Sequence, residues 1–397
     1  MKKLPKILLI AALILFSVGA TFYITYTELT RQYALELQTI TPVEQKTAEI
    51  SDYLGEYFID EYDEQALADA AAAAMVEATG DEWSYYLTAD EYAMYLESFY
   101  NAYVGIGVTI TEDEEAGGMR IESVVPNGPA DRSGVLVGDI LLQVEGQDTL
   151  TLGVTGTRDL VRGEEGTAVN MLFSRDGEKL ELTIVRESID TEVASCELLD
   201  GEIGYIRINN FDVRCADETI ACINEMRNAG AKALLFDVRF NGGGLKDEMV
   251  EVLDHLLPEG VLFRSVDYAG EEEVDYSDKR CIKLPMAVLV NLDSYSAAEF
   301  FAAALQEYGW ATVVGEQTYG KGNFQTSFEL SDGSMLNISI GKYYTPEGKS
   351  LTGVGITPDI VCELSDEDYA DLYYGVLEKE DDEQLQQALD ALRQKIS

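Results

Sequence analysis

The spacing of hydrophobic and polar residues changes along the chain, and the first part has a helical pattern. From Val43 to Phe58, apolar residues recur every three or four positions, which is typical of an amphipathic helix. The stretch 64–79 is rich in alanine, the strongest helix former. Thr88 and Glu91 have the spacing of a capping box, which opens a third helix. We therefore expect residues 28–101 to form a helical region.

Short strands and glycine-rich turns replace this pattern in residues 102–190. The segment PNGPADRSGVLVGD, residues 126–139, resembles the PDZ domain and leads into an apolar strand at 140–144. PDZ domains add an extended peptide to a sheet edge and hold its terminal carboxylate on backbone N–H groups. A small β domain whose glycines only form turns is the alternative. The corresponding peptide-binding loop contains Gly105, Ile106, Gly107 and Val108.

From residue 191 to residue 363, strands and helices alternate. This order predicts βαβ units and a largely parallel sheet, followed by a β-hairpin at 324–340. The predicted strands are 203–208, 233–239, 286–291 and 311–315, and the predicted helices between them are 216–228, 245–257 and 297–308.

The last part of the chain, residues 364–397, is an acidic helical tail. Apolar residues form a stripe at helical spacing there, which is typical of a docking or dimer helix. The stripe consists of Leu385, Leu389, Leu392 and Ile396.

The first 27 residues have the pattern of a membrane anchor. Three lysines precede an uncharged run from Ile7 to Thr27, which as a helix is about 31 Å long, enough to cross a bilayer. The basic end should stay in the cytoplasm, so the rest of the chain lies outside it. A cleaved signal peptide is the alternative, with Val18-Gly19-Ala20 as the cleavage site. In both cases the chain is exported.

Composition excludes several classes of function. The formal net charge of −45 repels nucleic-acid phosphates, so no nucleic-acid partner is expected. His255 is the only histidine, which excludes a zinc site built from histidines, and we expect neither a metal nor a cofactor. The 5 cysteines are odd in number and far apart, so we expect buried thiols and no disulfide framework.

Two of the predicted strands lead into candidate catalytic segments. Strand 233–239 runs into the glycine loop 241–244, whose backbone N–H groups can hold an anion. Strand 286–291 leads to Ser296 at the start of the next helix, where the helix dipole favours developing negative charge. Ser296 is therefore a candidate nucleophile. The alternatives are a tight turn for the glycine loop and an N-cap for Ser296, in a capping box with Glu299.

A nucleophilic serine needs a base, and Lys321 is the best placed candidate. His255 lies within a predicted helix, away from both strand ends. A lysine can act as a base when burial lowers its pKa, and a solvated loop lysine is the alternative. Residues 315–321 also match the first positions of a phosphate-binding P-loop, but Gly322 offers no hydroxyl for magnesium. We therefore do not expect nucleotide binding.

Taken in order, these segments resemble the carboxyl-terminal processing peptidases, also called tail-specific proteases, over roughly residues 45–363. The segments that carry the resemblance are the inserted PDZ-like segment, DVRFNGGG, LVNLDSYSAAEFFAAALQ, GEQTYGKGNFQ and KYYTPEGKSLTGVGITPDI. The resemblance implies a multidomain α/β protein, in which a PDZ-like domain at 102–190 is inserted before a ClpP/crotonase-like core at 191–363. It also implies a nucleophile, a general base, a residue that orients the base and two oxyanion-hole N–H groups, which fall respectively on Ser296, Lys321, Gln325, Gly243 and Ala297.

The chain departs from the family's usual pattern near these residues. Gly242 stands where proline is usual, and Ala298 stands where another serine is common. Leu292, Asp293 and Tyr295 replace smaller residues. Unless it points to solvent, Asp293 is expected to raise the pKa of the lysine.

The sequence thus predicts a serine endopeptidase that is anchored by a single-pass helix at residues 1–27, with its catalytic domain outside the cytoplasm. Its expected partners are the membrane, proteins or peptides with free carboxyl termini, and a second copy of the chain. Cleavage would proceed through an acyl-enzyme. The alternatives are a peptide-binding protein with an inactive core and a crotonase-type acyl-CoA enzyme. The latter is disfavoured because acyl-CoA is cytoplasmic and because such enzymes lack the PDZ segment.

Overall fold

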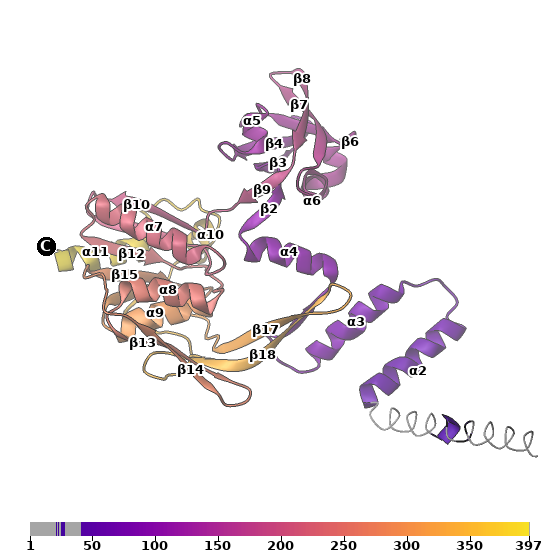
Figure 1. The fold of residues 1–397 in the computed structure, drawn as a ribbon. Coiled ribbons are helices and arrows are strands. Elements are labelled where there is room, and N and C mark those ends of the chain that lie inside the picture. Colours follow the sequence, from indigo (N-terminus) through magenta and orange to yellow (C-terminus); the bar gives the residue numbers. More distant parts are fainter. Residues whose placement is uncertain (1–20, 22, 24, 28–40, 397) are drawn as a thin grey trace, which may run out of the picture. The chain divides into compact units, whose positions relative to one another are not determined.

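The computed structural model describes residues 21, 23, 25–27 and 41–396 (Figure 1). Except at residues 21, 23 and 25–27, the expected membrane helix lies outside this part of the chain. Within the described residues, none of the helices combines the length and the apolar character that a membrane span requires. The chain divides into two compact units, which meet at Ala70 and Ala71.

The first unit contains α2 (Pro42–Tyr57) and the beginning of α3 (Glu64–Glu77). Thr41 and Glu44 form a capping box at the start of α2, and the helices expected in this stretch are confirmed. Neither α2 nor α3 buries a residue within the described part of the chain. Val43, Ile50, Tyr53 and Tyr57 of α2 are exposed, and Leu54 is partly buried.

One strand interrupts the region that the sequence predicts to be helical. β1 (Tyr85–Leu87) pairs antiparallel with β18 (Met335–Tyr344), so the expectation of an entirely helical region over residues 28–101 was wrong here. The strand forms by pairing with β18, which lies far away in the sequence. Local propensity does not reveal such a partner. α4 (Ala89–Phe99) follows, with the expected capping box of Thr88 and Glu91.

The PDZ-like segment is built mainly of strands. Its largest sheet has the order β3-β4-β5-β7-β8, with β6 paired to β5, and β2 pairs with β9. The expected strand 140–144 is confirmed, and the helix at 149–161 is kinked at Gly153. The elements are β2 (Ala102–Gly105), β3 (Val108–Asp113), β4 (Gly118–Val124), α5 (Pro129–Arg132), β5 (Ile140–Val144), β6 (Gln147–Asp148), α6 (Thr149–Val161), β7 (Ala168–Arg175), β8 (Glu178–Val185) and β9 (Glu187–Asp190).

The second part of the larger unit is organised around a six-stranded sheet (Figure 1). Its order is β10-β11-β12-β15-β16-β19, and all neighbours are parallel except β10 and β11. The predicted parallel sheet is therefore confirmed. The strands are β10 (Ala194–Leu199), β11 (Ile203–Ile208), β12 (Ala233–Asp237), β15 (Met286–Val290), β16 (Ala311–Gly315) and β19 (Ile360–Val361).

Helices cover both faces of this sheet, as the fully buried strands β12 and β15 require. α7 (Cys215–Asn228), α8 (Lys246–Leu256) and α9 (Ala297–Glu307) pack on the face that carries Phe236 and Val288. α11 (Glu383–Ile396) packs on the face that carries Leu235 and Leu289. Alternate residues of each strand thus enter separate core layers.

The apolar stripe of the tail is buried against this sheet. Leu385, Leu389 and Leu392 of α11 are 2%, 4% and 0% exposed. The stripe is therefore a docking surface within the chain, and reading it as a dimer surface was wrong. α10 (Asp366–Tyr373) precedes α11.

A second sheet contains the predicted hairpin of β17 (Asn323–Glu329) and β18. It also contains β1 and two strands that the sequence did not reveal, β13 (Gly260–Asp267) and β14 (Glu272–Ser277). β18 pairs with β1, β13 and β17 at different points along its length. This sheet therefore brings distant segments of the chain to the site described below.

All five cysteines lie in the described part of the chain and are free. Cys215 and Cys222 are buried as expected. Cys196, Cys281 and Cys362 are only partly buried, so the expectation that all five would be buried was wrong.

Candidate active site

Ser296 lies in a sharp turn between β15 and α9 and has an unusual backbone conformation. Its φ and ψ are 58° and −126°, whereas an ordinary N-cap residue is extended with a negative φ. Such a conformation is strained for a residue with a side chain and persists only where the surroundings hold it. The turn therefore resembles the strand-to-helix elbow that exposes a nucleophile, more than it resembles a simple helix cap.

Hydrogen bonds from neighbouring segments hold this turn in place. Ser294 Oγ donates to Val238 O (2.8 Å), and Tyr295 N–H donates to Asn241 O (3.1 Å). The turn is thus tied to the end of β12 and to the glycine loop. Ser296 itself is 8% exposed.

The glycine loop lies directly beside Ser296. A Cβ atom on Gly243, whose φ is 90°, would lie 2.7 Å from Ser296 Cβ and 2.9 Å from Ala297 N, so only glycine fits. The structure thus places the two predicted oxyanion-hole residues, Gly243 and Ala297, next to each other. The N–H of Gly243 donates to Asn241 Oδ1 (2.8 Å), and it must exchange this bond in order to bind a substrate oxygen.

Lys321 and Ser296 line the same cavity, which has a volume of about 900 Å³. Gly243 and Gln325 also line it, so the tertiary structure gathers residues that are far apart in the sequence. Burial lowers the pKa of Lys321 to about 8, while the charges of Asp81 and Glu299 oppose this shift. A lysine with such a pKa is partly neutral near physiological pH and can accept a proton.

Gln325 lies on β17, in the wall of this cavity. Its Nε2 donates to Asn323 O (3.2 Å) and to Ser339 Oγ (3.1 Å). Its amide nitrogen is therefore directed to these neighbours, and its role in orienting the lysine stays a prediction.

Glu299 connects the segment of Ser296 to the segment of Lys321. Its carboxylate is fully buried and accepts hydrogen bonds from the N–H groups of Ser296 (3.1 Å), Gly320 (2.7 Å) and Lys321 (2.8 Å), and from Thr318 Oγ1 (2.6 Å). Burial raises the pKa of Glu299 against the effect of these hydrogen bonds. Sequence reasoning identified only the capping role of Glu299, because its bonds to residues 318–321 depend on the fold.

Asp293 points to solvent, which is one of the two alternatives that the sequence left open. It is exposed, and Tyr369 Oη of α10 donates to its Oδ2 (2.6 Å). The carboxylates that raise the pKa of Lys321 are Asp81 and Glu299. Of the two alternatives for Asp293, the structure therefore supports the one in which it points to solvent.

Two of the departures from the family pattern, Gly242 and Tyr295, are linked by a contact in the structure. A Cβ atom on Gly242 would lie only 2.6 Å from the Tyr295 hydroxyl oxygen. The larger Tyr295 therefore uses the space that a proline at position 242 would need. The sequence alone explains neither departure, because the contact between positions 242 and 295 depends on the fold.

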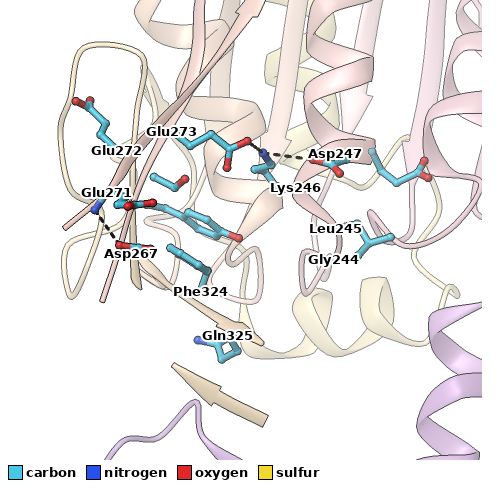
Figure 2. A pocket seen from close by; sticks show the side chains of 13 residues that line it. Gly244, Leu245, Lys246, Asp247, Asp267, Glu271, Glu272, Glu273, Phe324 and Gln325 are labelled. Carbon is cyan, nitrogen blue, oxygen red and sulfur yellow. Dashed lines mark hydrogen bonds and ion pairs between the residues drawn. The ribbon is translucent and has the colours of Figure 1, made fainter. Parts of the chain in front are cut away.

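A second cavity, of about 690 Å³, adjoins the first (Figure 2). Lys246 forms ion pairs there with Glu273 (3.1 Å) and Asp275 (3.2 Å), and although burial opposes it, this pairing raises the pKa of Lys246. Acidic residues dominate the lining, so one end of the active-site cavity faces negative charge. The two cavities share Gly244, Leu245, Phe324, Gln325 and Tyr343, and the acidic lining residues of the second are Asp247, Glu248, Asp267, Glu271, Glu272 and Glu273.

The residues predicted to bind a peptide in the PDZ-like segment line a groove of their own. Gly105, Ile106, Gly107 and Val108 border a cavity of about 280 Å³. The other lining residues are the apolar Ile110, Val154 and Val161, the polar Tyr103 and Thr109, and the basic Arg158 and Arg162. The groove therefore combines apolar walls with two arginines, which form ion pairs with Asp159 and Glu97 respectively.

Comparison with known proteins identifies the family. The model of peptidase family S41 matches residues 202–362, and a PDZ domain model matches residues 120–175. The carboxy-terminal processing protease CtpA of Bacillus subtilis is 32% identical over 315 residues, which cover 79% of this chain and 67% of that protein. The chain belongs to the carboxyl-terminal processing peptidases of family S41. The resemblance inferred from the sequence is confirmed, and the chain is a serine-type peptidase with a PDZ domain.

Further relatives agree with this assignment. The carboxy-terminal-processing protease of Bartonella bacilliformis is 31% identical to this S41 peptidase over 313 residues, which cover 76% of this chain and 70% of that protein. A solved structure from Bacteroides fragilis, assigned to the S41 proteases, has a TM-score of 0.51 at 18% identity and covers 85% of this chain and 91% of its own. The latter likeness supports the fold.

Proposed function

We propose that this S41 peptidase is an exported, membrane-anchored endopeptidase with Ser296 as nucleophile and Lys321 as general base. The observation that carries this proposal is the shared cavity: a serine in a strained elbow and a lysine with a pKa of about 8 line the same walls. A solvated loop lysine would keep its ordinary pKa, and an ordinary helix cap would have an extended backbone.

The proposed reaction begins when neutral Lys321 Nζ accepts the proton of Ser296 Oγ as this oxygen attacks a peptide carbonyl carbon. The carbonyl oxygen becomes an oxyanion, which the N–H groups of Gly243 and Ala297 bind. The C–N bond then breaks, and the leaving amine takes the proton from Lys321. Lys321 next deprotonates a water molecule, which hydrolyses the ester and returns the hydroxyl of Ser296.

The substrates of this peptidase are proposed to be proteins with free carboxyl-terminal tails. The groove beside Gly105 and Gly107 supports this, because it offers apolar walls and the charges of Arg158 and Arg162. A bound tail would place upstream residues of the same chain within reach of the protease. Amidation of the terminal carboxylate should therefore weaken binding of a test peptide, which fluorescence anisotropy measures.

The anchor and the location outside the cytoplasm are also proposals. They rest on the basic residues and the uncharged run of residues 1–27. The test is to add protease to intact cells that express the full chain. Degradation of the globular part in intact cells would support the proposal. Degradation only after the membrane has been permeabilised would contradict it.

We further propose that a second copy of the chain covers α2. Its exposed apolar side chains include Val43, Ile50, Tyr53 and Tyr57, and an isolated helix of this length is marginal in water. Light scattering on the detergent-solubilised full chain should give the mass of a dimer, and Ile50→Glu should give that of a monomer. A monomeric wild-type chain would contradict this proposal.

A peptide-cleavage assay tests the chemistry. The full chain is incubated with a peptide that has a free carboxyl terminus, and the products are weighed by mass spectrometry. Ser296→Ala and Lys321→Ala should each lose cleavage by at least about 1,000-fold while their thermal unfolding remains cooperative. Ser98→Ala is the matched control, because Ser98 lines the same cavity. Cleavage by Ser296→Ala at the wild-type rate would refute the assignment.

A further inference from the structure

Two aromatic rings from separate segments lie near Lys321, and a third ring packs on both of them. The Nζ atom lies 4.3 Å from the ring centroid of Trp83 and 5.9 Å from that of Tyr295. The ring of Trp83 also packs on those of Tyr295 and Tyr319, at centroid distances of 6.0 and 5.4 Å. We call Trp83, Tyr295 and Tyr319 the aromatic cluster.

We propose that Trp83 is a positioning residue for the general base: its ring holds the Lys321 amine in the catalytic cavity and keeps water away from it. This inference rests on the proposed function, in which Lys321 is the base. Trp83 precedes β1, in a region that the sequence suggested to be only helical. No motif in the sequence pointed to it.

The turn that carries Trp83 is fixed on the second sheet. The backbone oxygen of Trp83 accepts a hydrogen bond from Asn337 Nδ2 (3.3 Å), and Ser84 Oγ accepts one from Ser339 N–H (3.0 Å). Both partners belong to β18, which pairs with β1 directly afterwards. These hydrogen bonds use the backbone of Trp83 and the side chain of Ser84. Substitution of the Trp83 ring therefore leaves them in place.

Trp83 acts on Lys321 in two opposite ways. A ring face attracts an ammonium group and so favours the charged form, but the same ring excludes water and so favours the neutral form. Burial lowers the pKa of Lys321 to about 8, against the carboxylates of Asp81, in the same turn as Trp83, and of Glu299, in α9. Burial as a whole thus outweighs the two carboxylates, and we assign part of this burial to the ring of Trp83.

The aromatic cluster depends on Gly242. A side chain at position 242 would meet the hydroxyl of Tyr295, and displacement of Tyr295 would remove one of the rings that pack on Trp83. The unusual glycine and the unusual tyrosine thus both serve the environment of Lys321.

The test compares Trp83→Ala and Trp83→Phe in the full chain, by measuring kcat/KM on one peptide as a function of pH. In Trp83→Ala, water reaches Lys321, so the acid limb of the profile should move up by about one pH unit or more. Activity at pH 7 should then fall by about tenfold for each unit. Trp83→Phe keeps a ring and should restore most of the profile. Phe99→Ala, which also truncates an aromatic residue of the cavity wall, should leave the midpoint unchanged.

A direct titration separates failure of this inference from failure of the proposed function. The pKa of Lys321 is measured by carbon NMR of labelled lysine in the Ser296→Ala background, where no catalysis is needed. A higher pKa in Trp83→Ala than in Trp83→Phe supports the role of Trp83. An unchanged pKa, or a loss of activity with an unmoved pH midpoint, would overturn the role of Trp83 while leaving the proposed function intact. An active Lys321→Ala enzyme would refute the proposed function and, with it, the positioning role of Trp83.

Discussion

At the scale of residues, the site depends on side chains whose properties are changed by their surroundings. Ser296 has a strained backbone conformation that hydrogen bonds from adjacent residues maintain. Lys321 is an ordinary amine until burial lowers its pKa. Glu299 joins both residues through their backbone N–H groups. The chemistry therefore arises from environment as much as from residue type.

The pKa of Lys321 predicts how activity depends on pH. Because only the neutral amine accepts a proton, kcat/KM should rise with pH up to about 8 and should fall about tenfold per unit below it. A discontinuous peptide-cleavage assay between pH 5 and pH 9 measures this acid limb of the profile of kcat/KM against pH. An acid limb with a midpoint near pH 4 would show that a carboxylate, and not Lys321, is the base.

The same shift also predicts how stability depends on pH. The pKa of Lys321 is lowered from 10.5 to about 8 in the folded chain, so the unfolded chain binds more protons between these values. The free energy of unfolding contributed by Lys321 therefore rises with pH across this window and is least favourable below it. Urea unfolding of Ser296→Ala and Ser296→Ala/Lys321→Met should show a smaller pH dependence in the second variant.

At the scale of elements, short connecting segments determine the site, and the regular elements support them. The turn before α9, the glycine loop after β12 and the turn before β1 each contribute a residue around the cavity. β18 holds the last of these turns. The strands and helices themselves contribute mainly the buried layers between which these segments are fixed.

The contact between Gly242 and Tyr295 predicts a compensating pair of substitutions. Gly242→Ala places a methyl group 2.6 Å from the Tyr295 hydroxyl, so it should lower kcat/KM by about tenfold or more, because the loop or the ring must move. Gly242→Ala/Tyr295→Ala removes the clash and should restore part of the loss. Tyr295→Ala alone is the control, and effects that simply add would contradict a direct coupling.

At the scale of the whole molecule, the tail α11 completes the protease core. It covers one face of the six-stranded sheet, and a buried ion-pair network joins its start to the end of β12. Arg239 contacts Asp237 (2.6 Å) and Asp382 (2.9 Å), and all three side chains are less than 5% exposed. The network lies directly before the glycine loop, so docking of α11 and placement of the loop are connected.

Loss of Asp382 should therefore destabilise the core. Asp382→Ala leaves part of the buried charge of Arg239 without its partner, which typically costs about 3 kcal/mol or more. Chemical denaturation followed by circular dichroism measures this change. Asp381→Ala is the matched control, because Asp381 is exposed and its removal should change stability by less than about 0.5 kcal/mol. Equal effects of the two variants would contradict a role for the network.

Much of the architecture could be predicted from the sequence because it depends on local pattern. The continuous apolar runs of β12 and β15, the helical spacing in α8 and α9, and the capping box of α4 are visible within a few residues. β1 and β13 were missed because each pairs with β18, which is distant in sequence. β14 pairs with the neighbouring β13, in a hairpin that the local pattern of residues did not reveal.

The sequence by itself determined the family, the peptidase class and which serine, lysine and glycines to consider, because these depend on the type and order of residues. Only the tertiary structure decided that the tail stripe docks within the chain, that Tyr369 and not Lys321 contacts Asp293, and that Trp83 lies on Lys321. Each of these depends on burial or on a contact between segments far apart in the sequence. Such contacts change the pKa of a group and the space around it, and a linear pattern of residues contains neither.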